Sequence, residues 1–161
     1  MEKRGKSLFS LSTLLASFFG AAMIAGAFSY YNYKFAEYKF IDFKEWVFYE
    51  KKDIFRPQEE RYIVIFYSSK DAQSVARLET INLTIPIIAL DYYNEPHPNT
   101  DHITFLRSGT KNSLGFIQRF NIYDAPSIFF IKKVKDSLYK QDSMIRKLDN
   151  LDELSNEIQT L

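Results

Sequence analysis

The feature that most constrains the fold is a proline set directly before a short, strongly apolar run. Residues 127–131 read Ser-Ile-Phe-Phe-Ile, and such a run of β-branched and aromatic residues is typical of a strand buried on both faces. Pro126 stands just before it, at a position where a residue without an N–H is tolerated in a sheet. Upstream, residues 115–122 place apolar side chains at helical spacing, with an expected end near Asn121. The segment therefore predicts a helix, a turn, a proline and a buried strand in that order.

Two more apolar runs predict strands upstream of this segment. Residues 61–67 read Arg-Tyr-Ile-Val-Ile-Phe-Tyr, a composition that favours a strand. They lead into a helix that we expect Ser69 to cap and that runs to about Asn82. Residues 85–90 form the next run, which predicts a second strand, parallel to the first and ending at Asp91.

Downstream of the proline strand, the pattern predicts a hairpin and a final helix. Residues 132–137 form a polar turn, and residues 138 to about 144 are expected to return as a strand. An amphipathic helix from Asn150 to Leu161 follows, with Glu153 completing a capping box. The predicted order is strand, helix, strand, helix, strand, strand, helix. It spans about 100 residues, a normal size for one core.

This α/β order, with the Ala125-Pro126 step before an inner strand, resembles the thioredoxin-like superfamily. The resemblance covers residues 57–161 and implies a central mixed sheet flanked by helices. It also implies a cis peptide bond before Pro126, which is rare enough to be a deliberate feature. In that superfamily the region corresponding to Ala125, Pro126 and Ser127 marks a surface that grips extended polypeptide.

The chain contains no cysteine, so the redox chemistry of that superfamily does not transfer to it. The resemblance places the family's Cys-x-x-Cys motif at Asp71-Ala72-Gln73-Ser74. Dithiol exchange needs a thiolate nucleophile and a resolving thiol, and a carboxylate and a hydroxyl supply neither. Asp71 is expected instead to be a carboxylate at a helix start, where the helix dipole favours its charge.

No other catalytic or metal-binding pattern stands out. His97 and His102, with Glu95 and Asp101, carry metal-ligating groups, but their spacing matches no zinc signature and they lie in a Pro/Asn-rich segment. A solvated loop is the expectation there. Residues 108–110 read Ser-Gly-Thr without the flanking pattern of a nucleophile elbow. We therefore expect neither enzymatic activity nor a cofactor, a metal or a small-molecule substrate.

The charge balance argues against a nucleic-acid partner. The chain has 21 lysines and arginines against 20 acidic residues, and three of these cations lie within the first six residues together with Glu2. The remainder carries a net charge of −1. Nucleic-acid binding requires a clustered excess of lysine and arginine, which this part of the chain lacks.

The N-terminus predicts a membrane anchor. Residues 1–6 are basic, and no charged residue occurs from Ser7 to Tyr33. Its most apolar part exceeds the ~20 residues that span a bilayer, and tyrosines near its end suit an aromatic belt. The positive-inside rule keeps residues 1–6 in the cytoplasm. The prediction is an anchor over residues 7–31 in a bacterial inner membrane, with the C-terminal domain in the periplasm.

A cleavable signal peptide is the alternative for this region. Ala25-Gly26-Ala27 fits the small-x-small pattern of a cleavage site, which would then follow Ala27. The apolar stretch is longer than the usual core of a signal peptide, and aromatic residues follow it at once. Length therefore favours the anchor.

Residues 32–56 form an aromatic, charge-mixed juxtamembrane segment, predicted to be a helix or linker. A helical stripe along it comprises Ala36, Phe40, Phe43, Val47 and Ile54. Three roles remain open: lying on the membrane surface, packing on the following domain, or contacting a partner protein. For the last role the candidate contact residues are Phe40, Phe43, Trp46 and Val47.

Together these features predict a non-catalytic scaffold or adaptor subunit of a larger envelope assembly. A lysine-, isoleucine- and phenylalanine-rich composition suggests a low-GC bacterium, in which flagellar motors or secretion machinery carry added periplasmic subunits. That step rests on analogy at the level of the fold. The alternatives are a periplasmic chaperone or redox-pathway accessory that binds polypeptide beside the proline, and a thiol-independent enzyme.

Overall fold

The computed structural model describes residues 10–37, 39–80 and 83–148. It divides the chain into two compact units, Met1–Tyr38 and Lys39–Leu161. The predicted helix over residues 150–161 lies outside the described residues.

The first unit contains one long helix, α1, over Leu11–Glu37. The Oγ of Ser10 accepts a hydrogen bond from the backbone N–H of Thr13 at 3.2 Å, which satisfies one of the unpaired donors at a helix start. Its Leu11–Tyr33 portion is long and apolar enough to cross a membrane by length and composition, a test that a signal sequence also passes. The expected apolar N-terminal helix is therefore present.

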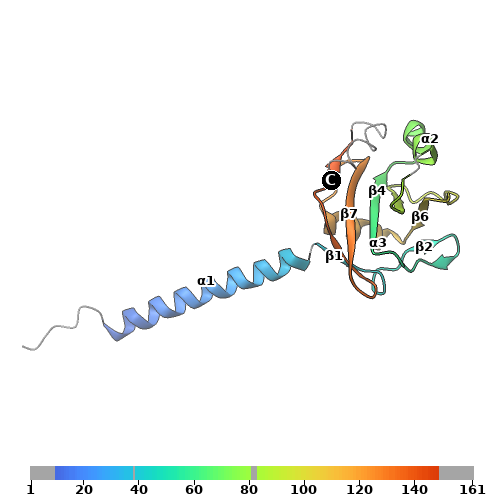
Figure 1. Cartoon of the computed structure of the whole chain (residues 1–161). Helices are drawn as coiled ribbons and strands as arrows, with labels where there is room; N and C mark the ends of the chain where they lie inside the picture. Colours follow the sequence, from blue (N-terminus) through green and yellow to red (C-terminus); the bar gives the residue numbers. More distant parts are fainter. Residues whose placement is uncertain (1–9, 38, 81–82, 149–161) are drawn as a thin grey trace, which may run out of the picture. The chain divides into compact units, whose positions relative to one another are not determined.

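The second unit is built on one curled, mixed sheet (Figure 1). Its strands are β1 (Phe40–Asp42), β2 (Tyr49–Glu50), β3 (Asp53–Ile54), β4 (Arg61–Tyr67), β5 (Ile87–Asp91), β6 (Ile103–Arg107), β7 (Ser127–Lys135), β8 (Leu138–Gln141) and β9 (Arg146–Lys147). Their spatial order is β1-β8-β7-β4-β5-β6-β2-β3, and β9 pairs with the start of β7. Strands β4, β5 and β6 are parallel, whereas β7 runs antiparallel to β4.

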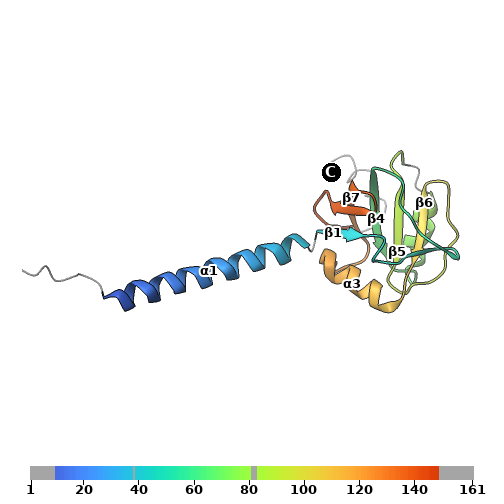
Figure 2. The ribbon, with the colours of Figure 1, turned by 90° about the horizontal axis from the view of Figure 1, so that it is seen from below.

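Two helices and two apolar clusters bury the faces of this sheet. Helix α3 (Thr110–Phe120) places Phe116 and Phe120 in one cluster, and Figure 2 shows α3 lying along one face of the sheet. Helix α2 (Ala72–Thr80) contributes Leu78 to the other cluster. Because successive side chains in a strand point to opposite faces, the central strand β4 feeds both clusters and is buried from Tyr62 to Tyr67.

Most of the elements predicted from the sequence are present. Strand β4 has the predicted bounds and pairs in parallel with β5. Helix α3 begins five residues earlier than predicted, and it ends where expected, with Asn121 in the left-handed conformation at φ 57°. The peptide bond between Ala125 and Pro126 is cis. The mixed α/β architecture is therefore confirmed.

Strand β6 was not predicted, and it changes the order of elements. It follows β5 through the loop of residues 92–102, which the structure leaves without a helix. The observed order from β4 to β9 is strand, helix, strand, strand, helix, strand, strand, strand. Strand β6 is too short for its hydrophobic periodicity to predict it, and it is stabilised by backbone hydrogen bonds to β5.

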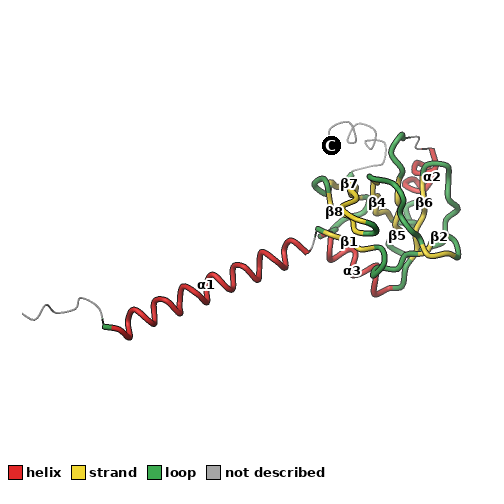
Figure 3. Tube along the Cα trace, turned by 60° about the horizontal axis from the view of Figure 1, so that its bottom comes forward, coloured by secondary structure: helices red, strands yellow, loops and turns green. Residues whose placement is uncertain are grey.

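The prediction of a juxtamembrane helix or linker over residues 32–56 is wrong from Phe40 onward. Residues 40–54 form β1, β2 and β3 instead, and β1 pairs with β8 (Figure 3). Phe43 is 5% exposed and packs against Phe48, Phe55 and Tyr139. This apolar burial outweighs the weak helical preference of a mixed segment. Of the three roles considered, packing on the domain is the one observed, and the folded unit begins at Lys39 rather than near residue 57.

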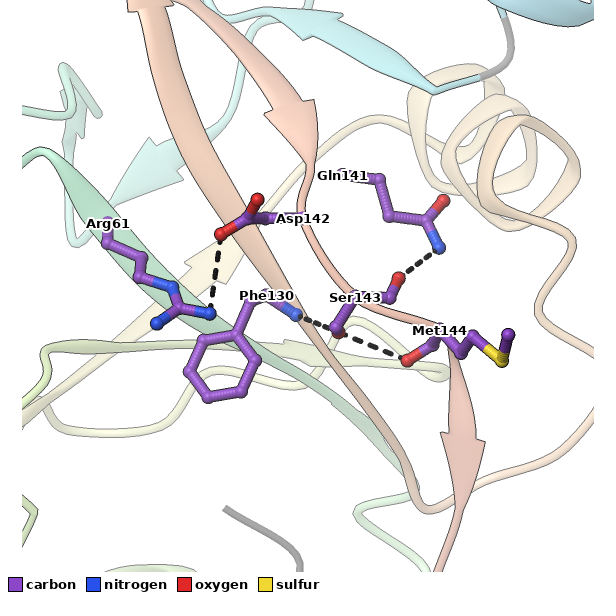
Figure 4. A network of polar contacts seen from close by, with 6 residues as sticks. All are labelled: Arg61, Phe130, Gln141, Asp142, Ser143 and Met144. Carbon is purple, nitrogen blue, oxygen red and sulfur yellow. Dashed lines mark hydrogen bonds and ion pairs between the residues drawn. The ribbon is translucent and has the colours of Figure 1, made fainter. Parts of the chain in front are cut away.

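The return strand is interrupted between β8 and β9, earlier than the predicted end near Met144. At the interruption the Oγ of Ser143 accepts a hydrogen bond from the N–H of Phe130 at 2.9 Å, which replaces a bond of the sheet ladder (Figure 4). Asp142 pairs with Arg61 at 3.3 Å, and the Arg61 guanidinium lies 4.0 Å from the centre of the Phe130 ring. Side chains thus hold the loop that joins the two strands.

Candidate functional site

The sheet register brings two of the predicted site segments, those of Asp71 and of residues 125–127, to one edge, at the carboxyl ends of β4, β5 and β6. Ser127 pairs with Phe66 near the end of β4, and Asp91 at the end of β5 pairs with Tyr67. Loops that leave the carboxyl ends of parallel strands meet at one side of a sheet. We call this side, comprising residues 68–71, 91–95, 107–109 and 124–127, the carboxyl edge.

Asp71 is a helix cap. Its carboxylate accepts a hydrogen bond from the N–H of Gln73 at 3.2 Å, and its backbone carbonyl accepts from Val75. Ala72 and Gln73 are exposed in the first turn of α2. The expectation of a helix-start carboxylate is confirmed for Asp71, and the prediction that Ser69 caps the helix is wrong.

The N–H of Ser69 is instead held by Asp91, a buried carboxylate that joins two loops. One oxygen of Asp91 accepts from the N–H of Ser69 at 2.7 Å, and the other from the N–H of Glu95 at 2.8 Å. Asp91 is 5% exposed. Charge-assisted bonds of this length are among the strong ones in proteins. Sequence reasoning placed Asp91 at a strand end but missed this role, because both donors lie in loops.

Tyrosines provide the exposed apolar surface of the carboxyl edge. Tyr92 and Tyr93 are 54% and 43% exposed, and the Nζ of Lys70 lies 4.0 Å from the centre of the Tyr93 ring. Tyr67 is fully buried and packs against Phe105, and burial, assisted by the charge of Asp91, raises the pKa of its phenol well above the usual value. The exposed side chains of this edge therefore include two aromatic rings and the Lys70 ammonium group, together with the charged Asp71, Glu95, Arg107 and Asp124.

The loop before β7 is fixed by its own backbone and by β9. Ser127 is 2% exposed and its hydroxyl donates to the carbonyl of Asp124 at 2.6 Å. The N–H of Leu148 donates to the carbonyl of Pro126 at 3.0 Å. Ala125 is exposed beside the half-buried Pro126. Of the three predicted residues, Ala125 is accessible to solvent, Pro126 is partly accessible, and Ser127 is buried.

The histidines lie in a loop, as predicted. His97 stacks on Phe105, with 4.4 Å between ring centres, and His102 is exposed. Over residues 10–37, 39–80 and 83–148 no three or more metal-ligating side chains gather. Ser108 is buried and hydrogen-bonds Asn94 through its backbone N–H, so it holds a turn.

The four candidate partner-contact residues have different surroundings. Phe43 is in the core and Phe40 is half-buried. Trp46 packs against Gly115 of α3, and the Arg119 guanidinium lies 5.0 Å from the centre of its ring. Val47 is half-buried and lines a cavity of about 490 Å³ between the 43–58 segment and the turn after β7. We call this cavity the basic groove, after the cations on its rim.

Comparison of the chain with protein-family models, with curated proteins and with solved structures gives no match.

Proposed function

We propose that the chain is a non-catalytic adaptor with a thioredoxin-like domain, held at a membrane by α1 and bound to other proteins of a bacterial envelope assembly. The thioredoxin-like part is supported by α2 after β4 and by the cis peptide before β7. Strand β6 and the β1–β3 segment are additions to the pattern on which the resemblance rested.

The observation that carries the proposal is that polar side chains at the carboxyl edge form hydrogen bonds to the backbone of the domain itself. The carboxylate of Asp71 caps α2, and both oxygens of Asp91 accept backbone N–H groups. These groups hold loops in place, and the exposed side chains of the edge include Tyr92, Tyr93 and Lys70. Exposed aromatic residues beside a cation suit protein recognition, because such residues are enriched at interfaces.

The membrane part of the proposal rests on Leu11–Tyr33 and on the basic residues that precede it. Because the chain has no cysteine, single cysteines can report its topology. A cysteine replacing Met144, which is 82% exposed, is expected to react with a membrane-impermeant maleimide added to cells with a permeabilised outer membrane. A cysteine replacing Lys6 is expected to react only after lysis. Equal labelling of both positions before lysis, in cells whose outer membrane is permeabilised, would contradict the orientation.

The adaptor role is tested by site-specific photocrosslinking in cells that express the full chain. Suitable positions are Tyr92 and Tyr123, at or beside the carboxyl edge, and Ile54, in the lining of the basic groove, which are 54%, 82% and 50% exposed. We expect at least one of them to give a discrete adduct whose partner co-purifies in a fixed ratio. Adducts with many unrelated polypeptides would indicate a chaperone instead. No reproducible adduct from any of the three would refute the adaptor.

A further inference from the structure

The basic groove lies at the opposite end of β4 and β7 from the carboxyl edge. Its lining includes Lys133, near the end of β7, whereas Ser127 at the start of that strand belongs to the carboxyl edge. Six residues of an extended strand, from Ser127 to Lys133, cover about 20 Å, so the two sites are separate. The groove therefore needs its own explanation.

An apolar floor forms one part of the groove. Phe43, Val47, Ile54 and Pro57 line it. Ile54 is 50% exposed, although it belongs to a strand that pairs with β2. A volume of about 490 Å³ falls within the range of sites that take a ligand or an anchoring side chain. The cavity as a whole is thus large enough to take one large apolar group against these four residues.

The rim carries an excess of positive charge. Three cations, Lys44, Arg56 and Lys133, and the carboxylate of Asp136 line the groove, and a second carboxylate, that of Asp42, bonds the lining residues Ser137 and Lys44. The excess is local, because the chain as a whole has a formal net charge of only +1. A cluster of this kind attracts an anionic group and fixes its orientation.

Both walls of the groove are held rigidly by hydrogen bonds. The hydroxyl of Tyr62 accepts from the N–H groups of Gln58 and Glu59 at 2.9 and 3.1 Å, and the hydroxyl of Tyr139 donates to the carbonyl of Glu59 at 2.6 Å.

On the other wall the carboxylate of Asp42 accepts from the hydroxyl of Ser137 at 2.6 Å and from the N–H of Lys44 at 2.9 Å. These two bonds, the Ser137 bond first, lower the pKa of Asp42. A preformed site loses less entropy when a ligand binds.

We infer that the basic groove binds an acidic segment of a partner protein, with one apolar side chain on the floor and flanking carboxylates on Lys44, Arg56 and Lys133. The inference rests on the proposed adaptor function and assigns a surface and a partner chemistry to it. A protein segment matches both halves of the site, because the floor selects an apolar group and the rim selects its acidic neighbours.

Binding is tested on the full chain in non-ionic detergent with three labelled twelve-residue peptides. The acidic probe has a central leucine flanked by glutamates, the neutral probe replaces each glutamate by glutamine, and the third keeps the glutamates but replaces leucine by serine. Fluorescence anisotropy is expected to show at least tenfold tighter binding of the acidic probe than of either other probe. Raising salt from about 50 to about 500 mM should weaken that binding, since the charges are solvent-accessible.

Two matched charge-reversal variants distinguish binding at the groove from a general effect of the net charge of the chain. The variant Lys44→Glu with Arg56→Glu should weaken binding of the acidic probe at least tenfold. The variant Lys111→Glu with Lys132→Glu makes the same change of charge at exposed positions outside the groove lining and should bind as the unmodified chain does. Equal binding of the acidic and neutral probes, or equal weakening by both variants, would overturn the inference.

Further outcomes distinguish failure of the groove inference from failure of the adaptor function. Protection of Lys44 from amine labelling in nanodiscs with 40% anionic lipid, absent in neutral nanodiscs, would assign the groove to the bilayer and overturn the inference. If the cellular partner still co-purifies with the Lys44→Glu, Arg56→Glu variant, the inference fails while the adaptor function stands. If no partner exists but the acidic probe binds as expected, the adaptor function fails instead.

Discussion

Replacing Asp91 by asparagine is the sharpest test of how the carboxyl edge is held. The wild-type carboxylate accepts two backbone N–H groups, from Ser69 at 2.7 Å and from Glu95 at 2.8 Å, in a position only 5% exposed. Asparagine keeps one acceptor oxygen and places an NH₂ group where the second acceptor stood. One backbone N–H is therefore left facing another donor.

The magnitude follows from these two bonds. A buried donor left unpaired costs about 1–3 kcal/mol. The remaining bond becomes neutral, and charge-assisted bonds are roughly twice as strong as neutral ones, so about 1 kcal/mol more is lost. We expect Asp91→Asn to lower the free energy of unfolding by about 2–4 kcal/mol, a large part of the ~5–15 kcal/mol of a typical domain.

Urea unfolding of the full chain in detergent, followed by the near-ultraviolet circular dichroism of its tyrosines, measures this loss. Asp101→Asn is the control, because Asp101 is exposed and the change of charge is the same. It should alter stability by less than about 0.5 kcal/mol. A loss below about 1 kcal/mol for Asp91→Asn would refute the view that this carboxylate is a structural acceptor.

Three further predictions concern the helix cap, the buried tyrosines and the packing of Trp46. Asp71→Ala should cost about 1 kcal/mol and Asp71→Asn much less, because asparagine also caps helices; equal losses in urea unfolding would contradict the capping role. Burial, first of all, raises the pKa of Tyr67 and Tyr139 in the folded chain, so above the ordinary tyrosine pKa of about 10 the unfolded chain binds fewer protons. Stability should therefore fall as pH rises past about 10, by about 1.4 kcal/mol per pH unit for each tyrosine. Tyr139→Phe should reduce this slope by one such contribution, and an unchanged slope in unfolding series up to about pH 12 would count against it. A Cβ on Gly115 would lie 3.0 Å from Cη2 of Trp46, so Gly115→Ala should gain the helix-propensity difference of about 1 kcal/mol only in a Trp46→Ala background. Equal gains in both backgrounds would exclude this contact.

The sequence predicts best what depends on local pattern. Strands β4 and β7 carry continuous apolar runs, and burial on both faces needs no knowledge of their neighbours. Strand β6 has five residues, and its identity depends on pairing with β5, which periodicity does not reveal. Strands β1 to β3 were harder still, because the same apolar residues also fit a helical spacing. Their pairing with β8 and β6 joins residues far apart in the chain.

In the candidate site too, the sequence predicts the features that depend on local pattern and misses those that depend on distant segments. Asp71 could be placed at a helix start because the apolar stripe of α2 follows it directly. The role of Asp91 depends on two loops, one of them 22 residues away in sequence. The basic groove depends on the 43–58 segment and the turn after β7 coming together. Neither the role of Asp91 nor the basic groove could be predicted from residue spacing. Val47 was a candidate because it lay on a predicted helical stripe, and the structure has no helix there.

Strand β1 has a mechanical consequence. It is the first strand after α1 and lies at one end of the sheet order, joined to β8 through three residue pairs, Phe40↔Lys140, Ile41↔Tyr139 and Asp42↔Leu138. Tension transmitted along the chain at Lys39 is borne by this short strand before any other. Asp42 holds one wall of the basic groove through its hydrogen bond to Ser137. Separating β1 from the sheet would break that bond and disrupt the wall. Tension on the chain at Lys39 and binding of a partner in the groove would therefore oppose each other.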